Sequence, residues 1–307
     1  MTHLTVYLPH LCLYQIEALG LNIEQTDCSV EKLDKDWQQD FIEAIDYPRE
    51  ELPWAQLRVT QFNSEKDDQF ACCCDPVLLQ LTHRGAYMMG QQQLAISEND
   101  AIRIVAQVNE RLMGPHERLL LVDKYSWLYI SDKQLTLESQ SIRRLIGKDM
   151  FDQGYRGKQA SDWQKLNTEI QMLIKEMMDY QGLTPSAPET LINVHFYDPV
   201  NVKDNNELPF INREQLVVCS DNELVKSFCM NSLISQQPVA DLSDIEGNVF
   251  LINFDSEKEN YLKIIHQIQT SLKEKQYLGI VINCADAKIV FQSNESLLSK
   301  FKRLLKQ

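Results

Sequence analysis

The three adjacent cysteines Cys72, Cys73 and Cys74 are the most conspicuous reactive side chains of the sequence, and Asp75 and Pro76 follow them directly. Thiolates can bind zinc, act in redox switches or carry lipid. Zinc sites usually pair cysteines about two to four residues apart at a turn, and the chain contains no CxxC. No lysine or arginine flanks the triplet to lower a thiol pKa. We expect reduced thiols at the entrance to a strand, with a metal, redox or lipid role as the alternative.

A second candidate site lies in the apolar segment 191–197, which we expect to be a strand. Because side chains alternate along a strand, Asn193 and His195 share one face, while Ile192 and Val194 share the other. Asp198 follows at the strand end. Asn193, His195 and Asp198 could bind a small anion in a crevice at the ends of the strands. The alternative is a solvated sheet face or a buried, hydrogen-bonded histidine.

The helix expected from Ser161 to about Met177 adds Glu169 and Gln171 to the ligand-binding candidates. At 100° per residue, these two side chains lie on opposite flanks of the apolar stripe. They therefore cannot both point at one small ligand from this helix, and the alternative is an interface or solvent position.

Charge and composition exclude several kinds of protein. The 307 residues carry 30 basic and 44 acidic side chains, a net charge of −14, which disfavours binding to nucleic acid or to anionic membranes. No long apolar run predicts a membrane span, and the N-terminal residues do not have the pattern of a signal peptide, so we expect a cytoplasmic location. Glycine is scarce, with 10 residues, and GxGxxG, GxxxxGK[ST], GxSxG and HExxH are absent. We therefore expect no cofactor and no metal.

The order of apolar segments predicts an α/β protein. We expect strands at 4–13, 77–81, 86–89 and 118–122 with 127–130, then 191–197, 215–219, 248–254, 277–283 and 288–292. Helices are expected at 97–112, 161–177, 222–233 and 256–273, with a weakly helical stretch at 30–47. We place an N-terminal α+β domain at 1–135, a connecting helical segment at 136–185 and a C-terminal α/β domain with a mixed sheet at 186–307.

Several short stretches carry a family resemblance. They are WQKLNTEIQML at 163–173, Asp75-Pro76-Val77, Trp127-Leu128-Tyr129, LIGKD at 145–149 and VVCSD at 217–221. Together they resemble a largely uncharacterised bacterial family known as phosphoglycerate-mutase-like or RpfE-type regulatory proteins, over most of residues 75–300. The helix at 163 and the strand after it are similar, in turn, to a central segment of archaeal-type cofactor-independent phosphoglycerate mutases. The resemblance implies a C-terminal domain like part of the alkaline-phosphatase and phosphoglycerate-mutase fold.

The sequence departs from that mutase pattern where the chemistry would be. Residues 175–180 replace a His-Pro-Val-Asn run, Phe196 and Tyr197 replace glycines, and His195 replaces a tryptophan. The superfamily uses a serine or threonine nucleophile beside two metals held by Asp and His, and this chain contains no Asp-His pair. We expect a non-catalytic regulatory or interaction protein with an unknown protein partner. The alternative is a degenerate phosphomutase- or phosphatase-like enzyme that binds a small phosphorylated metabolite.

Overall fold

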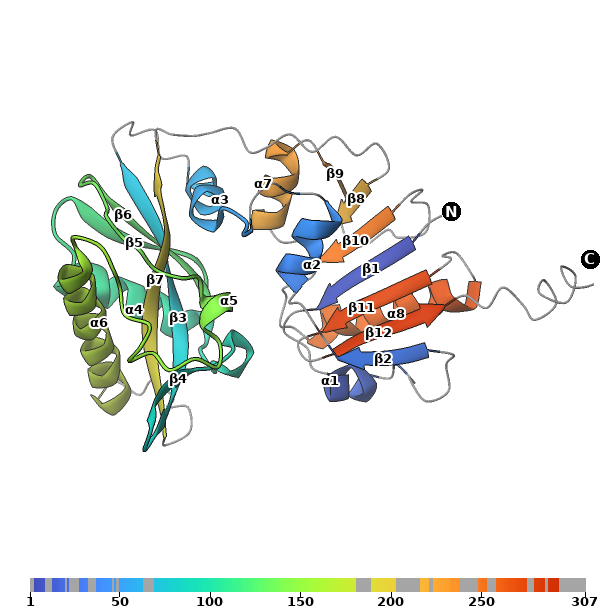
Figure 1. Ribbon diagram of the computed structural model, residues 1–307, viewed down its shortest axis with the longest axis horizontal. Helices are drawn as coiled ribbons and strands as arrows, with labels where there is room; N and C mark the ends of the chain where they lie inside the picture. The colour runs from blue at the N-terminus through green and yellow to red at the C-terminus, as the bar shows by residue number, and fades with distance from the viewer. Residues whose placement is uncertain are drawn as a thin grey trace, which may run out of the picture. The chain divides into compact units, whose positions relative to one another are not determined.

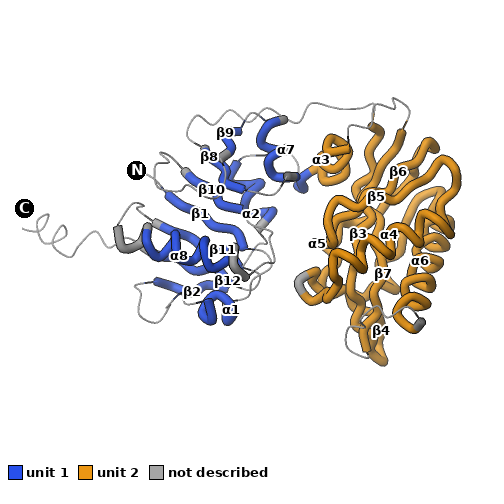
Figure 2. Tube along the Cα trace, turned by 180° about the vertical axis from the view of Figure 1, so that it is seen from behind, with its two compact units in different colours: residues 1–52, 207–307 blue, residues 53–206 orange. Residues whose placement is uncertain are grey.

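The computed structural model divides the chain into two compact units, which Figure 2 colours separately. Unit 1 comprises residues 1–52 and 207–307, and unit 2 comprises residues 53–206. The structure describes residues 3–8, 13–19, 21, 28–32, 37–45, 47, 50–62, 69–180, 189–202, 216–220, 223–232, 234–237, 248–252, 258–274, 279–284 and 287–292. The fold is of the α/β class, as predicted, with a mixed sheet in unit 1 and an antiparallel sheet in unit 2. No helix within these ranges is long and apolar enough to cross a membrane.

Unit 1 is built on a seven-stranded sheet of order β2-β12-β11-β1-β10-β8-β9 (Figure 1). Its strands are β1 (His3–Leu8), β2 (Cys28–Lys32), β8 (Leu216–Cys219), β9 (Ser235–Gln237), β10 (Asn248–Ile252), β11 (Gly279–Cys284) and β12 (Ala287–Gln292). The strand β1 is parallel to both neighbours, since Leu4 lies opposite Val249 of β10 and Ile280 of β11. The hairpin partner β12 and the edge strand β2 run antiparallel. The most N-terminal strand is thus enclosed by the most C-terminal part of the chain.

Helices cover the two faces of this sheet. They are α1 (Leu13–Ala18), α2 (Trp37–Ala44), α7 (Glu223–Asn231) and α8 (Lys258–Glu274). Alternation along β1 sends Leu4 and Val6 into a core shared with Ile16 of α1 and Ile268 of α8. Tyr7 points to the other face, where its ring stacks on that of Phe250, with 6.0 Å between ring centroids. Phe41 of α2 meets Phe250 edge to face at 5.8 Å. One face is therefore mainly aliphatic, and on the other aromatic rings pack together.

Unit 2 holds a five-stranded antiparallel sheet. Its strands are β3 (Phe70–Thr82), β4 (Gly85–Met88), β5 (Glu117–Asp123), β6 (Ser126–Ser131) and β7 (Thr190–Asn201). Along one side, β3 pairs first with β6 and then with β4, and along its other side it pairs with β7. No pair with β4 or β6 is made by β3 residues 74–78, and this stretch contains Pro76, which has no N–H to donate.

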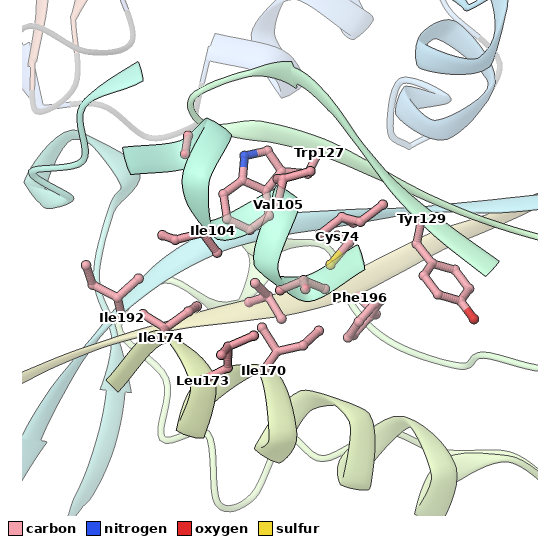
Figure 3. Packing of buried hydrophobic residues seen from close by; sticks show 14 of the residues in the cluster. Cys74, Ile104, Val105, Trp127, Tyr129, Ile170, Leu173, Ile174, Ile192 and Phe196 are labelled. Carbon is pink, nitrogen blue, oxygen red and sulfur yellow. The ribbon is translucent and has the colours of Figure 1, made fainter. Parts of the chain in front are cut away.

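Helices pack on both faces of the unit 2 sheet. They are α3 (Trp54–Gln61), α4 (Glu98–Arg111), α5 (Ile142–Leu145) and α6 (Ala160–Tyr180), with a 3₁₀ turn, η1 (Gln91–Gln93). Figure 3 shows Cys74 among the buried side chains of α4, α6, β6 and β7. Cys73 points to the opposite face, into a second cluster with Ala55 and Val59 of α3. The strand β3 is thus buried on both faces, and small thiols fit both cores.

Most predicted elements are present. The hairpins β5–β6 and β11–β12 and the helices α4 and α6 are confirmed, and Ser97 caps α4 by accepting the N–H of Asp100 at 3.1 Å. The strand predicted at 4–13 ends at Leu8, and a helix begins at Leu13. The stretch 30–47, predicted to be weakly helical, contains the end of the edge strand β2 as well as α2. The prediction that the three cysteines precede a strand is wrong, because they lie inside β3.

The two units differ from the domains predicted at 1–135, 136–185 and 186–307. Among the described strands, β1 pairs with β10 and β11, and residues 1–52 join the C-terminal part of the chain in unit 1. The strand β7, placed by prediction in the C-terminal domain, pairs along its whole length with β3 of unit 2. Long-range strand pairing of this kind leaves no mark in the local pattern of residues.

Candidate functional site

Asn193 lies on β7, at the edge of the unit 2 sheet, and its amide turns around that edge toward α6. Its Nδ2 donates to Oδ1 of Asn167 at 3.0 Å and lies 3.5 Å from Oε1 of Gln171. Its Oδ1 accepts the backbone N–H of Val194 at 2.8 Å. Asn193 and Gln171, both predicted site residues, are therefore brought together, and Asn193 also bonds to Asn167, a buried asparagine that sequence reasoning missed.

The same edge is covered by two further side chains. Nδ2 of Asn167 donates to the carbonyl of Val194 at 2.5 Å, and the hydroxyl of Tyr155 accepts the N–H of Phe196 at 3.2 Å. Asn167 also donates to the Tyr155 hydroxyl at 3.2 Å. An edge strand leaves backbone N–H and C=O groups to which another strand could bind. Here Asn167 and Tyr155 hydrogen-bond to two of these groups, the carbonyl of Val194 and the N–H of Phe196.

His195 is buried, and its Nε2 lies 2.8 Å from the carbonyl oxygen of Gln140 and 3.0 Å from Oγ of Ser139. Because a carbonyl only accepts, Nε2 carries the proton and donates. The ring is stacked between Tyr155 and Tyr197, with centroids at 5.7 and 6.0 Å. Burial lowers the pKa of His195 to about 4, although the Gln140 carbonyl and Asp75 favour the charged form. His195 is thus a neutral side chain at pH 7 that ties β7 to the loop before α5.

Asp198 caps a helix. Its Oδ2 accepts the N–H of Ala55 in the first turn of α3 at 2.8 Å, and Pro53 at the N-cap of α3 supplies no side-chain bond. The backbone of Asp198 has φ 53°, at a bulge where the β3–β7 register shifts between Ala71 and Cys73. The left-handed conformation, which asparagine and aspartate tolerate best after glycine, aims this carboxylate at α3.

Glu169 lies apart from the other predicted residues. Its carboxylate is 3.9 Å from Nζ of Lys165, one turn earlier on α6, and both side chains are largely exposed. Gln171 approaches Asn193, on the other flank of the helix. The two positions are separated as the helical geometry predicted.

A buried ion pair between Arg58 of α3 and Asp75 of β3 is the main polar feature that sequence reasoning missed. The guanidinium and carboxylate meet in two parallel hydrogen bonds, of 2.5 and 2.8 Å, and both side chains are almost fully buried. Trp127 donates its backbone N–H to Asp75 at 2.8 Å, and its carbonyl accepts from Arg58 at 2.7 Å. The Tyr197 hydroxyl donates to Asp75 at 2.7 Å. No local pattern joins Arg58 to Asp75, because the two residues lie 17 positions apart in the sequence.

The electrostatics of this cluster favour a fixed structural role. Burial and the neighbouring Asp75 charge raise the pKa of Tyr197 well above its ordinary value, so its proton stays in place. Burial disfavours the charge of Arg58, but Asp75 outweighs this effect and the net pKa of Arg58 is raised. A general acid or base works best with a pKa near the working pH, and neither group meets this condition.

Cys72, Cys73 and Cys74 are fully buried, and burial raises the pKa of each thiol well above its ordinary value. A thiol of this kind is a poor nucleophile and a poor metal ligand, because the thiolate is the reactive form. Among the described residues, no group of three or more His, Cys, Asp or Glu side chains is arranged to hold a metal ion.

One further polar cluster lies in unit 1, at the carboxyl ends of parallel strands. Tyr7, near the end of β1, donates its hydroxyl to Oδ2 of Asp40 at 2.8 Å. Asn283, near the end of β11, donates its amide to the same oxygen at 3.1 Å. Burial and Asp40 raise the pKa of Tyr7, so its hydroxyl is a hydrogen-bond donor at neutral pH. Open α/β sheets bind ligands at this edge, and a search of strand ends in the sequence could have found these residues.

Comparisons with known proteins give two distant structural likenesses. No protein-family model matches the sequence, and no curated protein matches it. A cofactor-independent phosphoglycerate mutase from Thermoplasma acidophilum matches 96% of this chain and 90% of its own, with 12% identity and a TM-score of 0.37. A protein from Pyrococcus horikoshii matches 95% of this chain and 87% of its own, with 11% identity and a TM-score of 0.42. At these values neither likeness assigns the chain to a family, and the resemblance to RpfE-type regulatory proteins stays a prediction.

Proposed function

We propose that the protein is a non-catalytic regulatory protein that acts by binding another protein. The observation that carries this proposal is that the predicted site residues already form hydrogen bonds within their own unit. Asn193 and His195 hydrogen-bond to backbone of their own unit, and Asp198 caps α3. A ligand would have to break these bonds and leave buried groups unpaired, at a cost of about 1–3 kcal/mol each.

The sequence supports the same proposal. Two-metal phosphoryl transfer needs carboxylate and histidine ligands that lower the pKa of the nucleophile and neutralise the phosphoryl oxygens. The chain has six histidines and no Asp-His pair. We therefore expect purified protein supplied with Mn²⁺ or Mg²⁺ to leave 3-phosphoglycerate unchanged. Turnover that is lost when Asp or His residues are substituted would contradict the proposal.

A second candidate function, the binding of a small phosphorylated metabolite, is favoured by Tyr7, Asp40 and Asn283. These residues lie where open α/β sheets bind ligands, and Tyr7 and Asn283 are donors of the kind that phosphate oxygens accept. The carboxylate of Asp40 already occupies both donors and would repel an anion, which is why we place this function second.

One pair of experiments separates the two functions. A thermal-shift screen of the full chain against inorganic phosphate, 3-phosphoglycerate, Mg²⁺ and Mn²⁺ should leave the melting temperature unchanged if the protein binds only other proteins. A ligand present at about 100 times its Kd would add about 2.7 kcal/mol of stability. Capture with tagged full chain, followed by reconstitution from purified components, should instead give a stoichiometric protein complex. A ligand shift that is abolished in Asp40→Ala, without a protein complex, would favour the second function.

A further inference from the structure

The strand β2 lies at one end of the unit 1 sheet (Figure 1). It pairs antiparallel with β12 over its whole length, from Cys28 opposite Phe291 to Lys32 opposite Ala287. Its last four residues are exposed to solvent, and Val30 is 46% exposed. One side of an edge strand faces its neighbour, and every second residue directs its backbone N–H and C=O to the other side. The edge of unit 1 can therefore accept a further strand.

The other sheet edges are short or covered. The strand β9, at the opposite end of the unit 1 sheet, has three residues. In unit 2, residues 147–150 bond to the backbone of β4, and Asn109 of α4 bonds to both backbone groups of Leu119 in β5. Side chains of Asn167 and Tyr155 bond to the backbone of β7. With five residues, four of them exposed, β2 is the edge most open to another strand among the described strands.

Val30 is the exposed end of an apolar row that crosses the aliphatic face of the sheet. The residues that lie opposite one another on successive strands of this row are Cys219, Leu251, Val6, Ile282, Ile289 and Val30. All of them except Val30 are buried in the same core cluster. Side chains that lie directly opposite each other on neighbouring strands pack together. The apolar surface of the core thus reaches the edge of the sheet at Val30, where an apolar side chain on an added strand would bury it.

A second copy of β2 is complementary to the first. In an antiparallel pair, opposite residues have side chains on the same face, so a two-fold axis perpendicular to the sheet must pass through one residue of the strand. An axis at Val30 pairs all five residues of β2, which an axis at Ser29 or Glu31 would not. Val30 then faces its own counterpart, Ser29 faces Glu31, and Cys28 faces Lys32. A serine hydroxyl can donate to a carboxylate, and no like charges lie opposite each other in this arrangement.

We propose that two copies of the chain associate through β2, so that their unit 1 sheets join into one continuous sheet across a two-fold axis at Val30. The backbone groups of each edge pair with those of the other, and the apolar rows of the two cores meet at the two valines. This inference goes beyond the proposed function and does not depend on it, because reconstitution with another protein tests that function separately.

The net charge of −14 on each copy opposes this association. At the edge itself the charges are mixed, since Lys288 of β12 lies opposite Glu31, and Lys32 follows Glu31. Salt screens the repulsion between the copies but not the backbone hydrogen bonds or the apolar contact that hold them together. The dimer should therefore tighten as the salt concentration rises. A pair of five-residue strands is a small contact beside a standard interface of about 1,600 Å², so we expect the dimer to be reversible.

Sedimentation equilibrium of the full chain, at several salt concentrations, tests this surface. Wild type should show a monomer–dimer equilibrium. Val30→Lys and Val30→Glu should each raise the dimer Kd by about tenfold or more, because apolar contact is lost and like charges lie directly opposite each other. An equimolar mixture of these two variants should recover association, since opposite charges then meet at the axis. This recovery is specific to an axis at Val30.

Two control variants and one measurement on wild type separate the contact from a change in folding. Val30→Ile keeps a β-branched apolar side chain and should dimerise at least as tightly as wild type. Ile102→Lys introduces the same charge at a position of α4 that is 49% exposed, and it should dimerise like wild type. In wild type, the backbone amides of β2 should exchange hydrogen more slowly as the protein concentration rises. Both charged Val30 variants should melt at the wild-type temperature at concentrations where wild type is monomeric.

Several results would overturn the proposal. Wild type that stays monomeric at about 1 mM would do so, as would equal dimerisation of Val30→Lys and wild type. A mixture of the two charged variants that does not associate would exclude an axis at Val30, and a dimer that weakens as salt rises would be held by charge instead. Binding of an extended segment of another protein along β2, without a dimer, would also overturn the proposal, because the edge would then belong to that partner.

Discussion

The carboxylate of Asp75 joins four elements of unit 2. It accepts hydrogen bonds from Arg58 of α3, the backbone of Trp127 in β6 and the hydroxyl of Tyr197 in β7, while its own backbone belongs to β3. Taking two charges out of water costs several kcal/mol per ion, and only good geometry with extra hydrogen bonds offsets this cost. The Arg58–Asp75 pair meets both conditions. Removing Asp75 would therefore leave Arg58, Trp127 and Tyr197 without their hydrogen bonds to this carboxylate.

Replacing Asp75 with leucine should destabilise unit 2 by about 3–5 kcal/mol, because the Arg58 charge would stay buried without its partner. Urea unfolding followed by tryptophan fluorescence measures this, since Trp54, Trp127 and Trp163 all lie in unit 2. The double variant R58M/D75L should recover part of the loss, because it removes both charges together. A loss below about 1 kcal/mol for Asp75→Leu would mean that the pair contributes no more than a surface ion pair.

His195 makes the stability of unit 2 depend on pH. Its pKa is about 4 when folded, below the ordinary value of about 6.5, so the unfolded chain binds the proton more readily. The stabilising contribution is fully present above about pH 6.5 and is lost as pH falls through about 4, a change of roughly 3 kcal/mol. Urea unfolding of wild type should show this decline.

The variant His195→Gln should decline less over the same pH range, because glutamine can still donate to the Gln140 carbonyl but does not titrate. His83→Gln, at an exposed position in the hairpin turn, serves as the control and should follow wild type. Identical pH dependence in wild type and His195→Gln would show that His195 is protonated as easily in the folded chain as in the unfolded one.

At the scale of elements, asparagines from helices close both edges of the unit 2 sheet. Asn109 of α4 donates to the carbonyl of Leu119 in β5 at 2.8 Å and accepts its N–H at 2.7 Å, as a neighbouring strand would. Asn167 of α6 covers Val194 of β7 at the other edge. Both helices therefore attach to the sheet through hydrogen bonds as well as through apolar packing, and both edges are blocked against pairing with another strand.

The variant Asn109→Ala should lower stability by about 1–3 kcal/mol, since it leaves two backbone groups of Leu119 without their partner. It should also aggregate faster on warming, which light scattering can follow. Gln107→Ala is the matched control on the same helix, because its amide bonds only to Glu110 at the surface. Equal aggregation of the two variants would argue against an edge-blocking role for Asn109.

The predictability of each element depends on how many of its faces are buried. The helix α4 has one buried face and a serine cap, so its spacing and its start could be predicted from the sequence. The first half of β3 is buried on both faces and shows no alternation, which is why the cysteines were placed outside it. The alternation along β7 explains why His195 stacks on Tyr197, two residues further on, but its partners Ser139 and Gln140 come from a distant loop.

At the scale of the whole molecule, unit 2 is one continuous segment inserted between two parts of unit 1. Its β3 and β7 ends are adjacent, since the N–H of Val202 donates to the carbonyl of Gln69 at 2.9 Å. Unit 2 has its own cores and its own sheet. A chain segment with these properties can fold without its host.

We therefore expect residues 53–206 to fold as an isolated fragment, with dispersed amide signals in NMR and cooperative urea unfolding. Residues 207–307 alone should not fold, because β10 and β11 would lack β1 between them. Adding residues 1–52 should restore the fold. A folded fragment of residues 207–307 would show that β1 is dispensable, and an unfolded fragment of residues 53–206 would show that unit 2 needs its host.

The run of three cysteines bears on how β3 is aligned with its neighbour β7. If the strand slipped by one residue against β7, a cysteine would still meet each core, because identical side chains stand at 72, 73 and 74. The cysteines therefore carry no information about alignment. The slip would, however, turn Asp75 away from Arg58 and into the apolar cluster around Phe196 and Trp163. The charge that follows the cysteines is what makes one alignment of the strand correct and its neighbours wrong.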